Sequence, residues 1–384
     1  MSLQPATDVL TPRQSGVSLT VGAVALLILG LQPVVLGGLA SEGRLTTDQI
    51  GVAATVELVA IGAACGLGAA LLKPHRIRWK VAAACVGHMV ATLATLAASG
   101  LAVILARGMA GVCAGVMLWL AIGAIARSAQ PERVAAVFAT AQTVAQLALA
   151  TLLSAAVVPR FGVNGALACL AGVSLLAALA CAAGPDQLAT DTVASEQPGT
   201  IGLPAIVGLV SIFFYLAGIV AVWVYLEPLG AASGLIPRDA ATAVDFTLAF
   251  QVVGGVTATV IGRRLPVYRT LVLAGAGVGL ILLCLGHSPE RIAFIACSAG
   301  FGFLWLFAFP FQTLMVIQLD PTRRAAMQLG AAQLLGSSAG PLAASLVVGA
   351  SDVRRVLGLA GALIAAAVAL VLVLAVRRRP GAQA

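Results

Sequence analysis

Three ionisable side chains lie inside long apolar stretches of this sequence: Glu57, Arg107 and Asp245. A carboxylate in a partly dry cavity binds a proton more readily than one in water, and a neighbouring arginine reverses that preference. A carboxyl group that moves between two such environments can load and release a proton. We therefore expect Glu57 to pair with Arg107 in one conformation and Asp245 to act as a second protonatable group. A static ion pair between two helices is the alternative for Glu57 and Arg107.

Two of the charged residues have a further possible role. A guanidinium matches the geometry of a carboxylate or phosphate, so Arg107 is also a candidate for binding an anionic substrate. Glu227, which precedes Pro228 near the end of another apolar stretch, is a candidate for a substrate cavity. A solvated helix end is the plainer interpretation of Glu227.

Glutamines and aromatic residues supply the neutral candidates for a cavity. Glutamines inside apolar helices either hydrogen-bond a substrate or link neighbouring helices. Phe301, Trp305, Phe309 and Gln312 fall on one helical face, which suits an apolar cavity, with core packing as the alternative. His88 is expected to be a core histidine with its hydrogen bonds satisfied. The neutral cavity candidates are Gln32, Gln142, Gln146, Gln251, Trp305, Phe309, Gln312 and Gln333.

The composition identifies the environment of these residues as lipid. Of the 384 residues, 60% are hydrophobic and 9% are charged, against roughly 45–50% and 25% in soluble domains. So few charges cannot cover a water-exposed surface, which excludes a soluble enzyme. The net charge of +8 is spread over short clusters between apolar runs, without the basic stripe of a nucleic-acid-binding protein.

Apolar runs long enough to cross a hydrocarbon core of about 30 Å predict the elements that carry the candidate residues. Twelve transmembrane helices are expected, at about 17–39, 49–72, 81–98, 101–126, 134–158, 164–183, 203–228, 240–262, 270–286, 291–317, 325–349 and 355–376. The connections that share a side with the two termini carry fifteen lysines and arginines, and the opposite connections carry six. This bias predicts that both termini lie in the cytoplasm, and we expect a multi-pass protein of the bacterial inner membrane.

The second half of the chain repeats the first with a shift of about 190 residues. The clearest match aligns Pro131, Arg133, Ala135 and Ala136 with Pro321, Arg323, Ala325 and Ala326. We therefore expect an N-terminal six-helix bundle at 1–184, a cytoplasmic linker at 185–202 and a C-terminal six-helix bundle at 203–384. A duplication of this kind places a substrate site near mid-membrane, between the halves.

This organisation resembles the major facilitator superfamily over the whole chain. The fourth predicted helix carries Arg107 followed by Gly108, Gly111 and Gly115, similar to the arginine-and-glycine pattern of that family. After the second helix, the family signature Gly-x-x-x-Asp-Arg-x-Gly-Arg-Lys is represented by the basic segment 68–76, in which Leu72 stands at the aspartate position. The resemblance implies an all-α integral membrane fold made of two pseudo-symmetric six-helix bundles.

The same resemblance implies a transporter that rocks two halves around a central cavity. The sequence contains no Gly-Lys-Ser/Thr phosphate-binding loop, so ATP is not the expected energy source, and the buried acids favour coupling to protons. We expect export of a small, partly apolar organic molecule by a monomer. The alternative is proton-symport uptake of an organic anion recognised through Arg107. An enzyme, a cofactor and a metal are not expected, because the three histidines are scattered and the seven cysteines show no CxxC spacing.

Overall fold

The computed structural model describes residues 10–73, 75–128, 131–187, 201–287, 290–320, 324–348 and 352–377. The predicted pair Pro321 and Arg323 lies outside these residues. The described parts are built from helices, which confirms the expected all-α fold. The α-helices are α1 (Pro12–Ala25), α2 (Leu27–Ser41), α3 (Thr47–Leu71), α4 (Ile77–Ala94), α5 (Leu101–Ala126), α6 (Pro131–Leu152), α7 (Val158–Ala180), α8 (Leu203–Val224), α9 (Leu226–Ala232), α10 (Pro237–Ile261), α11 (Val267–Gly286), α12 (Arg291–Leu319), α13 (Arg324–Met327), α14 (Leu329–Val348) and α15 (Arg355–Arg377).

Among the described residues, eleven apolar helical runs are long enough to cross a membrane. One of them, Val137–Ala183, is 47 residues long, about twice the length that a single crossing needs. It contains Gly162, whose φ of 61° interrupts the helix between the two predicted spans. Dividing the run there makes twelve crossings, so the number twelve stays a prediction.

Three of the predicted spans, the first, the seventh and the eleventh, are broken helices, the eleventh between α13 and α14. The first consists of α1 and α2, which meet at Leu26, and the seventh continues past Tyr225 into α9. Proline explains the second break: Pro228 has no N–H for the carbonyl of Val224, four residues earlier, and the helix ends there. Such interruptions leave backbone carbonyls free to accept other hydrogen bonds.

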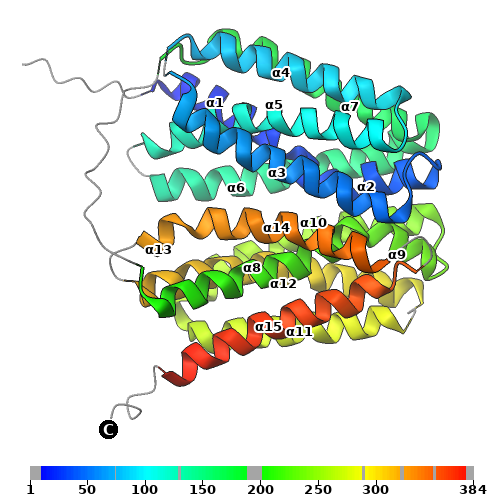
Figure 1. Cartoon of the computed structure of the whole chain (residues 1–384), viewed down its shortest axis with the longest axis vertical. Coiled ribbons are helices and arrows are strands. Elements are labelled where there is room, and N and C mark those ends of the chain that lie inside the picture. Colours follow the sequence, from blue (N-terminus) through cyan, green and yellow to red (C-terminus); the bar gives the residue numbers. More distant parts are fainter. Residues whose placement is uncertain are drawn as a thin grey trace, which may run out of the picture.

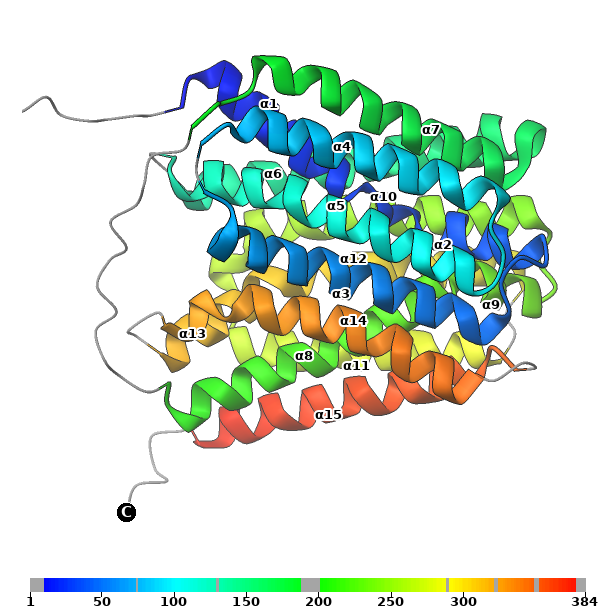
Figure 2. The ribbon, with the colours of Figure 1, turned by 45° about the horizontal axis from the view of Figure 1, so that its top comes forward.

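The helices lie side by side in two groups (Figures 1 and 2). Helices α1–α7 form one group and α8–α15 the other, and α1 begins at the same end of the molecule where α15 ends. The groups meet through α3 against α14 and α6 against α10, with α2 also touching α8 and α9. The bundle boundaries at residues 184 and 203 stay a prediction.

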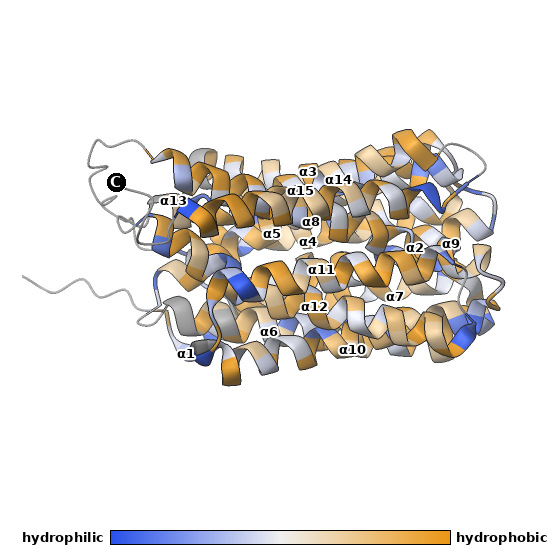
Figure 3. Cartoon of the chain, turned by 90° about the horizontal axis from the view of Figure 1, so that it is seen from below, coloured by the Kyte–Doolittle hydropathy of each residue, from blue (hydrophilic) through white to orange (hydrophobic). Residues whose placement is uncertain are grey.

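The outer surface is that of a protein in lipid. Figure 3 shows hydrophobic residues along the length of the helices and hydrophilic ones gathered towards their ends. Large apolar side chains face outward, such as Ile292, which is 81% exposed, and Leu346, which is 80% exposed. So large an exposed apolar surface is unfavourable in water but favourable in contact with lipid acyl chains. The composition-based prediction of a multi-pass membrane protein therefore agrees with the structure.

Candidate functional site

Small residues bring Glu57 of α3 and Arg107 of α5 together. A Cβ atom added to Gly115 would lie 2.5 Å from the carbonyl oxygen of Ile61, and one added to Gly108 would lie 2.9 Å from Val56. The two helices therefore approach closely enough for the side chains to meet. Arg107 Nε donates to Glu57 Oε2 at 3.1 Å, and Nη2 donates to Oε1.

This ion pair is sealed from its surroundings. The side chains of Arg107 and Glu57 are 0% and 1% exposed. Removing two charges from water is costly, and the two parallel hydrogen bonds offset much of that cost. The guanidinium presents no surface to a solute in this conformation. Its Nη1 atom is buried and has no hydrogen-bond partner among the described residues.

Asp245 and Glu227 form a separate acidic pair where the two groups of helices meet. Asp245 of α10 interacts with the hydroxyl of Thr151 in α6. Glu227 of α9 packs against Gly37 of α2, where an added Cβ would lie 3.1 Å from the Glu227 Cβ. The two carboxyl groups are close enough to interact electrostatically. Glu227 is thus half-buried against the opposite group rather than at a solvated helix end.

No pattern in the sequence linked these two acids. They lie on the consecutive helices α9 and α10, which run in opposite directions. This succession of two helices was the one feature of the sequence that pointed to their proximity. Asp245 makes its described contacts here and does not join the pair of Glu57 and Arg107.

Two backbone carbonyls around the break in the first span accept side-chain hydrogen bonds. Pro33 has no N–H for the carbonyl of Leu29, and the indole Nε1 of Trp223 donates to that oxygen at 2.7 Å. Gln146 Nε2 donates to the Leu26 carbonyl at 2.8 Å. Gln146 therefore links α6 to the junction of α1 and α2, whereas Trp223, which sequence reasoning missed, links α8 to α2.

The remaining glutamines differ in how well their amides are satisfied. Gln32 is 0% exposed, and neither of its amide atoms has a partner in the part of the chain that the structure describes. Gln333 is half-buried, with Nε2 equally unpartnered there. Gln251 is buried and Gln142 is half-buried.

The predicted aromatic face of α12 divides into two environments. Trp305 packs edge-on against Trp223, with ring centroids 5.8 Å apart, and against Phe301 at 6.3 Å. Trp305 therefore packs against Trp223, the residue whose indole contacts α2. Phe309, further along the helix, is half-buried.

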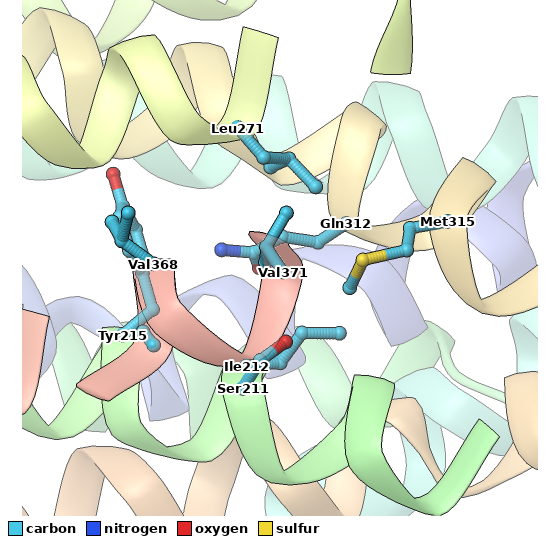
Figure 4. Close-up of a pocket in the computed structure, with 9 residues that line it drawn as sticks. Ser211, Ile212, Tyr215, Leu271, Gln312, Met315, Val368 and Val371 are labelled. Carbon is cyan, nitrogen blue, oxygen red and sulfur yellow. The ribbon is translucent and has the colours of Figure 1, made fainter. Parts of the chain in front are cut away.

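Gln312 lies inside the C-terminal group of helices, away from the contact between the groups. It lines a cavity of about 20 Å³ between α8, α11, α12 and α15, together with Ser211, Tyr215, Leu271 and Val371 (Figure 4). Its Oε1 atom is buried without a partner among the described side chains and backbone. The placement differs from the predicted central cavity because a helix that packs on several neighbours has more than one buried face.

Two hydrogen bonds join α3 to the opposite group. The N–H of Gly51 donates to the Tyr225 hydroxyl at 3.0 Å, and Thr55 Oγ1 donates to the Ser338 carbonyl at 2.9 Å. A Cβ added to Gly51 would lie 2.7 Å from the Tyr225 hydroxyl, so only glycine permits this approach. These contacts hold α3 against α8 and α14, and no sequence pattern predicted them.

A carboxylate from the predicted linker reaches the basic turn after α3. Asp186 Oδ1 accepts from Arg78 Nε at 2.9 Å, and its backbone carbonyl accepts from the N–H of Ile77 at 3.0 Å. Both side chains of this ion pair are partly exposed, so solvent screens much of their attraction. The linker thus provides an acidic partner for a turn in which Leu72 replaces the aspartate of the family signature.

Comparison with known proteins gives results at the level of the fold. No protein-family model matches the chain, and no curated protein matches it in sequence. A crystal structure of the nucleoside transporter NupG is similar with a TM-score of 0.70 and 14% identity, covering 95% of this chain and 99% of NupG. The crystal structure of an aspartate-to-alanine mutant of NupG is similar with a TM-score of 0.73 and 12% identity, covering 96% and 100%. The chain therefore has the fold of the major facilitator superfamily, in agreement with the resemblance seen in its sequence.

Proposed function

We propose that this protein is a secondary transporter that moves a small organic molecule across a membrane by alternating access, coupled to protons. A transporter fold over nearly the whole chain supports the first part. The buried pair of Glu57 and Arg107 supports the second part. Burying an ionised pair that is 0–1% exposed costs desolvation free energy that apolar packing between the same two helices would not. We place the protein in the bacterial inner membrane as a monomer.

Proton binding acts differently on the two acidic sites. Protonation of Glu57 removes the charge that neutralises Arg107, which weakens the contact between α3 and α5. At Asp245 and Glu227, protonation instead removes a repulsion between two like charges. Both acids belong to the C-terminal group and lie against Thr151 and Gly37 of the opposite group. Burying their charges in that contact costs solvation free energy, so the charged forms favour separation of the groups there. Protons thereby bias which contacts between the groups form.

Export of a small, partly apolar solute is the function that these residues support best. The side chains near the contact of α2 and α8 are neutral amides and indole rings, including those of Gln146, Trp223 and Trp305. Uptake of an organic anion through Arg107 has less support, because Glu57 occupies its guanidinium and no part of it is exposed.

Uptake of a nucleoside is the second candidate. Two solved structures of similar fold are of a nucleoside transporter. Gln32, whose two amide atoms are unpartnered among the described residues, offers both a donor and an acceptor for a polar ring edge. Indole rings such as Trp305 suit stacking on a nucleobase.

Flux measurements in proteoliposomes of both orientations test these alternatives. Three labelled solutes would be compared under an imposed pH gradient: uridine, a neutral aromatic drug-like compound and benzoate. We expect the aromatic compound to move in the direction opposite to proton flow. Uridine or benzoate moving with protons would replace the export proposal, and flux of all three that ignores the gradient would contradict proton coupling.

A further inference from the structure

A short chain of hydrogen bonds fixes the orientation of His88 in α4. The side chain is 2% exposed, and Nδ1 lies 2.8 Å from the Ser174 hydroxyl in α7. That hydroxyl donates its only hydrogen to the Leu170 carbonyl at 2.9 Å. Ser174 Oγ must then accept from His88, so Nδ1 carries a hydrogen, and the neutral ring has its lone pair on Nε2.

The lone pair on Nε2 is buried within electrostatic range of a cation. Nε2 has no hydrogen-bond partner among the described residues, and the same holds for Nη1 of Arg107. The two side chains are close enough for the charge of Arg107 to act on the imidazole. Their helices are in contact, since a Cβ added to Gly87 of α4 would lie 2.8 Å from Cys113 Sγ of α5. One atom is a free acceptor and the other a free donor, so the two are complementary.

We propose that His88 is a positioning residue for Arg107, and that its Nε2 accepts a hydrogen bond from Arg107 Nη1, directly or through one water, when Glu57 takes up a proton. This inference rests on the proposed proton coupling and extends it. A proton added to the Glu57 carboxylate makes a neutral acid, while Arg107 keeps its charge and loses its counter-ion. The neutral imidazole then remains as the acceptor that holds the guanidinium in place.

The other polar groups around the ring are accounted for. Glu57 of α3 pairs with Arg107, and Ser174 of α7 occupies Nδ1. Thr92, one turn from His88 on α4, has a buried hydroxyl without a partner in the described chain and can donate to a bridging water. A water with several such partners is stable in a buried polar site.

The protonation state of the ring tests the first step directly. The full-length protein in nanodiscs would carry ¹⁵N-labelled histidine, and His88→Gln would identify the signal of this residue among the three histidines. We expect hydrogen on Nδ1 and none on Nε2. A ring protonated on Nε2 would overturn the proposal.

A double-mutant cycle tests the second step. Glu57→Gln imitates the protonated acid, His88→Leu removes the acceptor, and His88→Gln keeps one. We expect His88→Leu to lower the unfolding temperature about twice as much in the Glu57→Gln variant as in the parent protein, with His88→Gln restoring most of the loss. Equal losses in both backgrounds would overturn the inference. Should His88→Leu fail to fold, the cycle is run with His88→Asn, whose shorter amide cannot reach Arg107.

Failure of this inference differs from failure of the proposed function. An additive cycle in a protein that still moves protons overturns the role of His88 alone. A non-additive cycle in a protein without proton movement keeps the role of His88 in holding Arg107 and overturns the coupling.

Discussion

The indole nitrogen of Trp223 donates a hydrogen bond to the carbonyl oxygen of Leu29, 2.7 Å away, and so joins α8 to α2 across the contact between the two groups of helices. The carbonyl is free because Pro33 lacks the N–H that would otherwise reach it. A proline in one half thus creates the acceptor for a tryptophan in the other. Leaving such a buried carbonyl unsatisfied costs about 1–3 kcal/mol.

Trp223→Phe should therefore lower the unfolding temperature of the purified protein, because it removes the donor and keeps the aromatic ring. Trp79→Phe is the matched control, since Trp79 is 71% exposed. A second variant that combines Pro33→Ala with Trp223→Phe gives the Leu29 carbonyl a backbone partner and should recover part of the loss. Equal effects of Trp223→Phe and Trp79→Phe would show that the hydrogen bond contributes nothing.

Single and paired substitutions of Glu57 and Arg107 separate charge from packing. Glu57→Met alone leaves a buried unpaired guanidinium and should destabilise the protein by about 3–5 kcal/mol. Glu57→Met together with Arg107→Met removes both charges and should recover most of the stability. Denaturation monitored by tryptophan fluorescence checks this order, which fails if the paired variant is the less stable of the two.

Gln312 and Gln146 make a second matched comparison. Gln312→Met removes an unsatisfied acceptor from the cavity inside the C-terminal group and should raise the unfolding temperature. Gln146→Met removes the donor to the Leu26 carbonyl and should lower it. A fall with both variants would mean that a bound water already satisfies Gln312.

Asp245→Asn should relieve the repulsion between Asp245 and Glu227. We expect a higher unfolding temperature at pH 8 together with slower transport, because a neutral amide costs less free energy to bury against α6 than a carboxylate and the contact between the groups then opens less readily. Asp239→Asn is a suitable control, since Asp239 of α10 pairs with Arg291 instead. This variant should have a lower unfolding temperature than the parent protein. A lower unfolding temperature for Asp245→Asn would contradict a repulsive pair.

The spans and the fold were predictable because lipid imposes long apolar runs on the sequence. The interruptions were less visible: Pro33 and Pro228 signal free carbonyls, yet only the fold shows that Trp223 comes from the other half to meet one of them. Periodicity placed Gln312 on a buried face but could not say which neighbours that face meets.

Contacts between charged residues were likewise only partly predictable from the sequence. The pairing of Glu57 with Arg107 was expected from two opposite charges inside apolar stretches, whereas the sequence did not indicate how fully the pair is shut off from water. The contact of Asp186 with Arg78 joins a linker to a turn more than a hundred residues away, and no local pattern encodes it. The proximity of Glu227 to Asp245 depends on the break at Tyr225, which redirects the chain.

Proton movement driven by solute is the most direct test of the central claim. Proteoliposomes loaded with a pH-sensitive dye would receive an outward gradient of the solute identified in the flux screen, without any imposed pH gradient. We predict a change of internal pH with the parent protein and none with Glu57→Gln, although that variant still gains thermal stability from the solute. An unchanged pH response in Glu57→Gln would contradict proton coupling through this residue.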